Sequence, residues 1–175
     1  MRKVFCLLFV VFLGCHNYKV RSALNEANIR GAKVLVMTYQ HVYKFIGTED
    51  GTYVLCKDLL EKHEKEIREG TYSEGMLRRD CADTVRIWEI RFDKILTAVA
   101  LNLEVAEDLL ATWKSADEEK YIAVIGNLVM AFKNLLDFLK VSGVNLPDQL
   151  ESYMADLTLL ENTIICKHDK LACKE

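Results

Sequence analysis

Residue types that commonly do chemistry in proteins are few in this chain of 175 residues. The histidines are His16, His41, His63 and His168, and there are six cysteines. No serine lies in a G-x-S-x-G nucleophile turn, and there is no H-E-x-x-H zinc motif, glycine-rich phosphate loop or EF-hand pattern. We therefore predict that the protein is not an enzyme and uses no cofactor.

One group of side chains has the spacing of metal ligands. Cys166, His168 and Cys173 could supply three of the four ligands of a zinc ion, with Cys56 or Cys81 as the fourth. In an oxidising compartment such thiols form disulfides instead. Because the N-terminal residues indicate that compartment, we predict no metal site.

Two of the histidines lie inside predicted helices. His41 stands among apolar helix positions, so we expect it at the edge of the core with its hydrogen bonds satisfied. His63 belongs to the segment EKHEKEIRE at residues 61–69, in which acidic residues precede basic ones by four positions. That spacing is typical of a solvated helix face, and we expect His63 to be solvated with it.

The first residues have the pattern of a secretory signal. Arg2 and Lys3 form a charged start, and VFCLLFVVFL follows at residues 4–13. This apolar segment has the length of a signal core and is too short to span a bilayer. We therefore predict a secreted, extracellular protein.

The cleavage site is predicted after Ser22. Val20 and Ser22 suit the third and first positions before a cut, which makes residues 1–22 the signal peptide and residues 23–175 a single helical domain. A cut after Cys15 is the alternative.

Four cysteines remain after the signal, an even number that indicates two disulfides in a secreted chain. In a simple helical hairpin, Cys56 and Cys81 would differ by roughly 10 Å in their distance from the turn. That counts against a bond between them, although a loop that doubles back could absorb the difference. The pairing is left open among Cys56, Cys81, Cys166 and Cys173.

Charge restricts the partners. The whole chain has a net charge of −3, and four of its 23 Lys and Arg residues but none of its 26 Asp and Glu residues lie in the predicted signal. The remaining domain therefore carries −7 and has no basic cluster. Nucleic acid and anionic membrane surfaces are not expected as partners, and a positively charged extracellular protein suits the domain better.

The fold is predicted to be all-α, a disulfide-tied bundle of about five helices. One proline and eight glycines leave few helix breakers, and no stretch alternates apolar and polar residues as a strand would. Apolar residues recur every three or four positions in five segments. These segments are residues 24–46, 53–69, 73–114, 121–141 and 147–166.

Turn and cap signals separate these segments. Gly47 is predicted to end the first helix, with a turn over residues 48–51, and Gly70 to end the second. A capping box begins at Ser115, and Pro147 opens the last helix.

The third predicted helix is the longest. Over residues 73–114 it would measure roughly 60 Å, more than a compact bundle of this size needs. Its aromatic residues are expected to be core residues, because they fall on one uninterrupted apolar stripe. The stripe consists of Cys81, Val85, Trp88, Phe92, Ile95, Val99, Leu103, Ala106, Leu110 and Trp113.

Residues 121–141 form the most apolar predicted helix. Lys120, Asn127 and Asn134 mark a narrow polar strip, and apolar residues cover most of the remaining surface. A helix of this kind is buried by neighbours on several sides. We therefore predict that it is the central rod of the bundle.

The signal, the small acidic helical body and the four cysteines, two of them near the C-terminus, resemble small salivary proteins of blood-feeding insects. Within that group the chain looks like the anopheline inhibitors of complement and contact activation, and is similar to the C-terminal domain of aegyptin-type antigens. It lacks their acidic, glycine-rich N-terminal region, so the same mode of collagen binding is not expected. The resemblance implies a secreted, non-enzymatic inhibitor of host haemostasis or complement that acts on a plasma protein through a protein–protein surface.

A carrier of a hydrophobic small molecule or lipid is the alternative. This function would need a cavity along the apolar helix at residues 121–141. Odorant-binding proteins usually have six cysteines, whereas four remain here after the signal.

Overall fold

The structure is a computed structural model that describes residues 2–112 and 118–168, with side chains described within residues 20–112 and 119–163. Over these ranges the chain contains helices and no strand, which confirms the all-α prediction. The helices are α1 Arg2–Ile46, α2 Glu49–Lys62, α3 Glu64–Arg68, α4 Glu74–Ala111, α5 Glu118–Val141 and α6 Asp148–His168.

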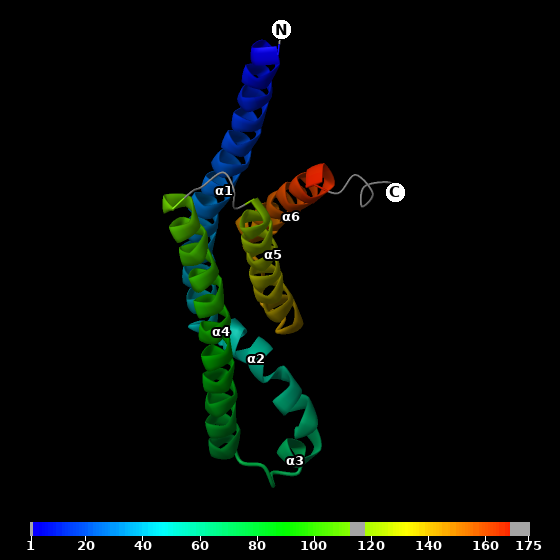
Figure 1. Cartoon of the computed structure of the whole chain (residues 1–175). Helices are drawn as coiled ribbons and strands as arrows, with labels where there is room; N and C mark the ends of the chain where they lie inside the picture. Colours follow the sequence, from blue (N-terminus) through cyan, green and yellow to red (C-terminus); the bar gives the residue numbers. More distant parts are fainter. Residues whose placement is uncertain (1, 113–117, 169–175) are drawn as a thin grey trace.

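Four long helices form a ring. Going round it, α1 packs against α4, α4 against α5, α5 against α6, and α6 against α1 (Figure 1). The helix predicted to be the central rod is α5, and this prediction is wrong, because α5 forms one wall of the ring. The arrangement is therefore four helices around a shared core, and α2 and α3 pack outside it.

We call α2 and α3 the α2–α3 arm (residues 49–68). The arm leaves the end of α1 and extends away from the ring beside the N-terminal half of α4 (Figure 1). The single predicted helix over residues 53–69 is thus two helices that meet at His63.

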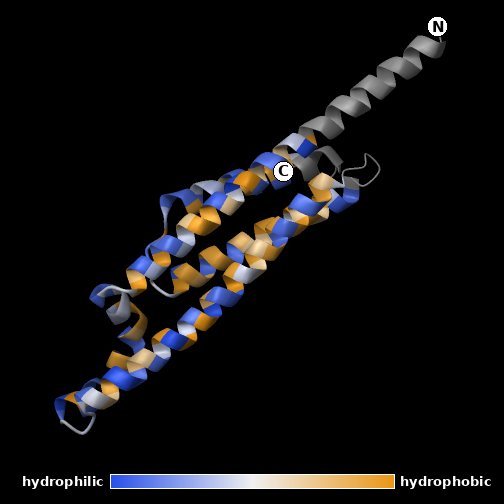
Figure 2. Cartoon of the chain, turned by 90° about the vertical axis from the view of Figure 1, so that its left-hand side faces the viewer, coloured by the Kyte–Doolittle hydropathy of each residue, from blue (hydrophilic) through white to orange (hydrophobic). Residues whose placement is uncertain are grey.

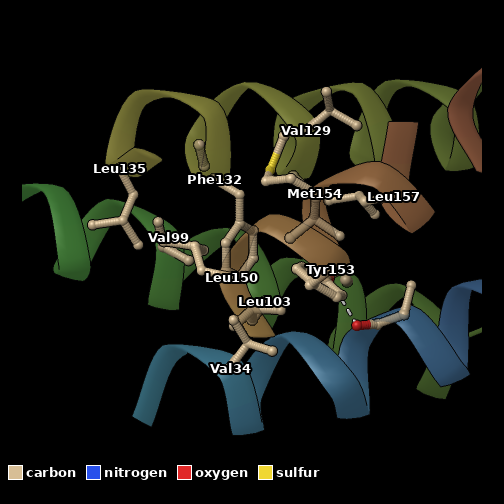
Figure 3. Packing of buried hydrophobic residues seen from close by; sticks show 14 of the residues in the cluster. Val34, Val99, Leu103, Val129, Phe132, Leu135, Leu150, Tyr153, Met154 and Leu157 are labelled. Carbon is tan, nitrogen blue, oxygen red and sulfur yellow. Dashed lines mark hydrogen bonds between the residues drawn. The ribbon is translucent and has the colours of Figure 1, made fainter. Parts of the chain in front are cut away.

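Side chains from all four ring helices meet in the core. Phe132 of α5 contacts Tyr153 of α6 edge to face, with ring centroids 4.7 Å apart, and Val34 of α1 and Leu103 of α4 approach them from the other walls (Figure 3). The predicted inner face of the last helix is confirmed where it is described, whereas Ile164 and Ile165 lie outside the described side chains. Its buried residues are Leu150, Tyr153, Met154 and Leu157.

The apolar surface of α5 is larger than its buried face. Apolar residues at three- and four-residue spacing face the core, whereas Met130 and Val141 are 64% and 89% exposed. By length and composition Glu119–Val141 could also cross a membrane, but 44% of its most apolar window is buried against protein, as in a bundle helix. Both hydrophilic and hydrophobic residues are distributed along the described helices (Figure 2).

The stripe on α4 has two different environments. Phe92, Val99 and Leu103 are buried inside the ring, whereas Val85 and Trp88 nearer the start of the helix are only half-buried. The N-terminal part of α4 has α2 beside it, and Val85 lines the space between these two helices. Trp88 lies at the boundary, where its ring stacks on Phe138 of α5. Trp113, at the end of the predicted stripe, lies outside the described residues.

The helix ends follow local signals. Thr48 caps α2 by accepting a hydrogen bond from the Gly51 N–H, so α2 begins four residues earlier than predicted and the turn is shorter. Ser73 caps α4, at the predicted start of that helix, and Gly70 has a φ of 70° at the predicted stop. The capping box predicted at Ser115 lies outside the described residues.

Gly31 of α1 allows α6 to approach closely. A Cβ at this position would lie 2.6 Å from Tyr153 Oη and 2.8 Å from Leu103 Cδ2. The Tyr153 hydroxyl is held in place because it is buried and donates a hydrogen bond of 2.8 Å to the Ala27 carbonyl. The side chain at residue 31 must therefore be absent for these two helices to pack.

We predict opposite effects of alanine at two helical glycines. Gly31→Ala should destabilise the protein by about 1–2 kcal/mol, because overpacking outweighs the gain in helix propensity. Gly126→Ala is the matched control: its Cβ would meet only a mobile Glu161 carboxylate oxygen, at 3.4 Å, so it should stabilise by about 0.5–1 kcal/mol. Urea unfolding measures both, and equal effects of the two substitutions would contradict the packing.

A second prediction concerns Tyr153 and pH. Burial raises the pKa of Tyr153 above the ordinary tyrosine value of 10.0. The contribution of this side chain to stability is therefore complete below pH 10 and is lost as the pH rises towards the folded-state pKa. Tyr153→Phe should cost about 1 kcal/mol at neutral pH, where the hydrogen bond is lost. By about pH 11 the difference should vanish, because only the wild-type unfolded state gains by releasing this proton. Urea unfolding at both pH values tests this, and a constant difference would contradict it.

Candidate functional site

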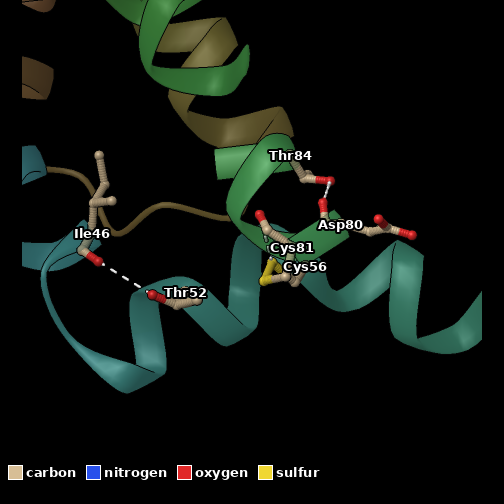
Figure 4. Close-up of a disulfide and its surroundings, with 6 residues drawn as sticks. All are labelled: Ile46, Thr52, Cys56, Asp80, Cys81 and Thr84. Atoms are coloured by element: carbon tan, nitrogen blue, oxygen red, sulfur yellow. Dashed lines mark hydrogen bonds between the residues drawn. A yellow bond between two sulfur atoms is a disulfide. The ribbon is translucent and has the colours of Figure 1, made fainter. Parts of the chain in front are cut away.

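The α2–α3 arm is attached to α4 by a disulfide between Cys56 and Cys81, whose Cα atoms lie 5.5 Å apart (Figure 4). Cys56 and Cys81 are therefore paired, contrary to what a simple helical hairpin predicts. More residues separate Cys56 than Cys81 from the loop that joins α3 to α4. The chain changes direction at His63, where α2 ends and α3 begins, and this change brings Cys56 beside Cys81. Cys166 and Cys173 lie outside the described side chains, and the second predicted disulfide is not tested.

His63 lies at the break between α2 and α3. Its Nδ1 is paired with the Glu66 carboxylate, and its ring stacks on Tyr72 with centroids 4.3 Å apart and planes 6° apart. The side chain is 21% exposed, so the prediction that it is solvated with the rest of its segment was wrong. The aromatic ring that covers His63 belongs to Tyr72 in the loop after α3. Helical periodicity could not predict this contact, because Tyr72 is not part of the helix.

Tyr72 also joins this turn to α4. Its hydroxyl donates a hydrogen bond of 2.6 Å to Asp80 Oδ2, which is the main cause that raises the pKa of Tyr72 and lowers the pKa of Asp80. The Arg79 guanidinium, 3.1 Å from the other Asp80 oxygen, lowers the Asp80 pKa further. The chain before α4 is thus fixed to α4 at two points. The disulfide fixes α2 at Cys56, and this hydrogen bond fixes the loop after α3 at Tyr72.

An open cleft of about 680 Å³ lies between α2 and α4 beside the disulfide. We call it the α2–α4 cleft. Its apolar lining comes from both helices and includes the two bonded cysteines, and Tyr53 in its lining is 61% exposed. The lining residues are Gly47, Thr48, Glu49, Thr52, Tyr53, Cys56, Leu60, Leu77, Arg78, Cys81, Ala82, Val85, Arg86 and Glu89.

The charged residues of the cleft are not equivalent. Arg78 pairs with Glu74, one turn earlier on α4, and Arg86 lies 3.5 Å from Asp83. Glu49 of α2 and Glu89 of α4 take part in no ion pair within the part of the chain that the structure describes. The two walls of the cleft therefore each present a carboxylate beside an apolar lining.

This cleft was not predicted from the sequence, although one signal pointed to it. The stripe on α4 begins near Cys81 and makes the helix longer than the ring requires. An apolar stripe that extends past its bundle must be covered by something else, here α2, and the incomplete cover leaves the cleft.

The other residues considered for chemistry have structural roles. Trp88 stacks on Phe92 and Phe138 at 5.2 and 5.1 Å and donates a hydrogen bond of 2.7 Å to the Ser142 hydroxyl, which supports the predicted core role. His41 is exposed at the edge of the ring with Nε2 3.0 Å from the Asn145 carbonyl oxygen, as expected.

No group of three or more His, Cys, Asp or Glu residues is placed to hold a metal ion among the described residues. The spacing considered for zinc, at Cys166, His168 and Cys173, lies outside the described side chains. The apolar and charged side chains of the α2–α4 cleft can contribute apolar contacts and charge to a bound partner.

We predict that removal of the disulfide loosens the arm and spares the ring. Cys56→Ala combined with Cys81→Ala should lower the free energy of unfolding by about 3 kcal/mol, chiefly because the unfolded chain is no longer restrained. Hydrogen exchange should accelerate in residues 49–68 and stay unchanged in α5 and α6. Equal acceleration across the whole chain would contradict a separate arm.

No family model, curated protein or solved structure matches this chain. The resemblance to salivary proteins of blood-feeding insects therefore stays a prediction.

Proposed function

We propose that the chain is a secreted, non-enzymatic binding protein that binds an extracellular protein at the α2–α4 cleft. The observation that carries this proposal is the open apolar cleft outside the core, held in shape by a disulfide. Exposed tyrosine and arginine line it, and these residue types contribute most to binding energy at protein interfaces.

The proposed extracellular location has two supports. The N-terminal residues have the charge and length pattern of a secretory signal. The bond between Cys56 and Cys81 is of a kind that persists in oxidising compartments and is rare in the cytosol.

The chemistry of the cleft suggests the chemistry of the partner. Leu60, Leu77 and Val85 line it, and Glu49 and Glu89 stand on its two walls. A partner segment with an apolar side chain next to a lysine or arginine complements this arrangement. The acidic net charge of the chain would increase the rate of such an encounter.

Host haemostasis or complement is the setting that we propose for this partner. The support is the resemblance of the signal, the acidic helical body and the cysteines to salivary inhibitors of those systems. A rigid protein that occupies one surface of a host assembly would inhibit it without any catalytic group.

Carriage of a hydrophobic small molecule is the second candidate. The volume of the cleft, about 680 Å³, is within the range of small-molecule sites, roughly 300–1,000 Å³. In this version the ligand would lie beside the disulfide, because the inner face of α5 is packed against its neighbours (Figure 3).

The test is a pull-down from host plasma, with clotting and complement assays on the same preparation. Tyr53→Ala should weaken binding to the recovered protein by at least about tenfold, as expected for an interface hot spot. Tyr39→Ala is the control, because Tyr39 is 47% exposed on α1 and does not line the cleft. Equal losses from both variants, or no plasma ligand and no inhibition at micromolar concentration, would reject the proposal.

Native mass spectrometry separates the two candidates. A lipid that co-purifies with the wild type and is lost from Tyr53→Ala would favour the carrier. An empty protein that still binds a plasma component would favour the inhibitor.

A further inference from the structure

Val20 belongs to the folded bundle. Its side chain is 7% exposed and joins the same core cluster as Leu24 and Ala27, the next inward positions of α1. The inward positions thus continue at three- and four-residue spacing on both sides of Ser22, the residue after which the sequence pattern predicted cleavage.

Arg21 contacts the C-terminal end of α4. Its Nη2 donates a hydrogen bond of 3.2 Å to the Leu110 carbonyl, 89 residues away in the chain. Carbonyl groups in the last turn of a helix lack N–H partners, and a cation is favourable there. The last turn of α4 contains no basic residue of its own, so Arg21 supplies the charge.

We infer that the signal peptide ends before Val20, and that cleavage occurs after Cys15 to give a mature protein that begins at His16. This inference rests on the proposed secretion. A cut after Ser22 would remove a core side chain and the arginine that caps α4.

Between the apolar signal core and Val20, the small residues that could precede a cut are Gly14 and Cys15. A cut after Gly14 would place Phe12 at the third position before it, where a small or aliphatic residue is preferred. A cut after Cys15 places Leu13 there. The mature chain then keeps Lys19 and Arg21, loses only two of the 23 basic residues and has a net charge of −5.

The test is expression of the full chain in a eukaryotic secretory host, with N-terminal sequencing and intact mass of the secreted product. We expect His16 as the first residue. A first residue of Ala23 would overturn the inference and leave the proposed secretion intact. A chain that stays in the cells at full length would overturn both.

Matched variants sharpen the test. Ser22→Leu should leave the cleavage position unchanged, whereas Cys15→Leu should block it or shift it, because a large residue is rejected immediately before a cut. Val20→Ala should lower the Tm of the secreted protein by about 2–6 °C. An unchanged Tm together with loss of cleavage in Ser22→Leu would place the cut after residue 22 and overturn the inference.

Discussion

The bond between Cys56 and Cys81 is the interaction on which the shape of the α2–α4 cleft depends. Inside the ring, each helix has two neighbours and is held by buried apolar side chains from several directions. The N-terminal part of α4 packs beside α2, and side chains such as Val85 stay half-buried there. Hydrophobic contact alone is therefore weaker in this half of the molecule, and the disulfide with the Tyr72–Asp80 hydrogen bond compensates for it.

This arrangement separates the core from the proposed binding site along a single helix. The second half of α4, around Val99 and Leu103, supplies core residues to the ring, and its first half supplies a wall of the α2–α4 cleft. Substitutions in the cleft should therefore leave the ring folded, so that their effect on the proposed binding can be measured separately. The apolar surface of α5 has a structural explanation, because its buried residues line the ring. The cleft is lined instead by Tyr53 and Glu49 of the arm and by Glu89 of α4.

The helices could be predicted from the sequence because their apolar periodicity and caps are local signals. The predicted helix stop at Gly70 and the predicted helix start at Ser73 are both found in the structure. The buried face of α6 also agrees with the face predicted from its apolar spacing. The neighbours of each helix could not be predicted in this way. The apolar residues on most sides of α5 predict a helix at the centre of the bundle. Periodicity, however, shows only that a face is buried and does not identify the helix that covers it. The break at His63 depends on a tyrosine from the following loop, and the cysteine pairing depends on that break.

Hydrogen exchange with and without the recovered plasma protein tests most directly whether the α2–α4 cleft is the binding surface. If it is, bound partner should slow exchange in residues 49–60 and 77–89, the two walls of the cleft, and leave α6 and the second half of α4 unchanged. Protection confined to the ring helices, with unchanged exchange in the arm, would contradict the account.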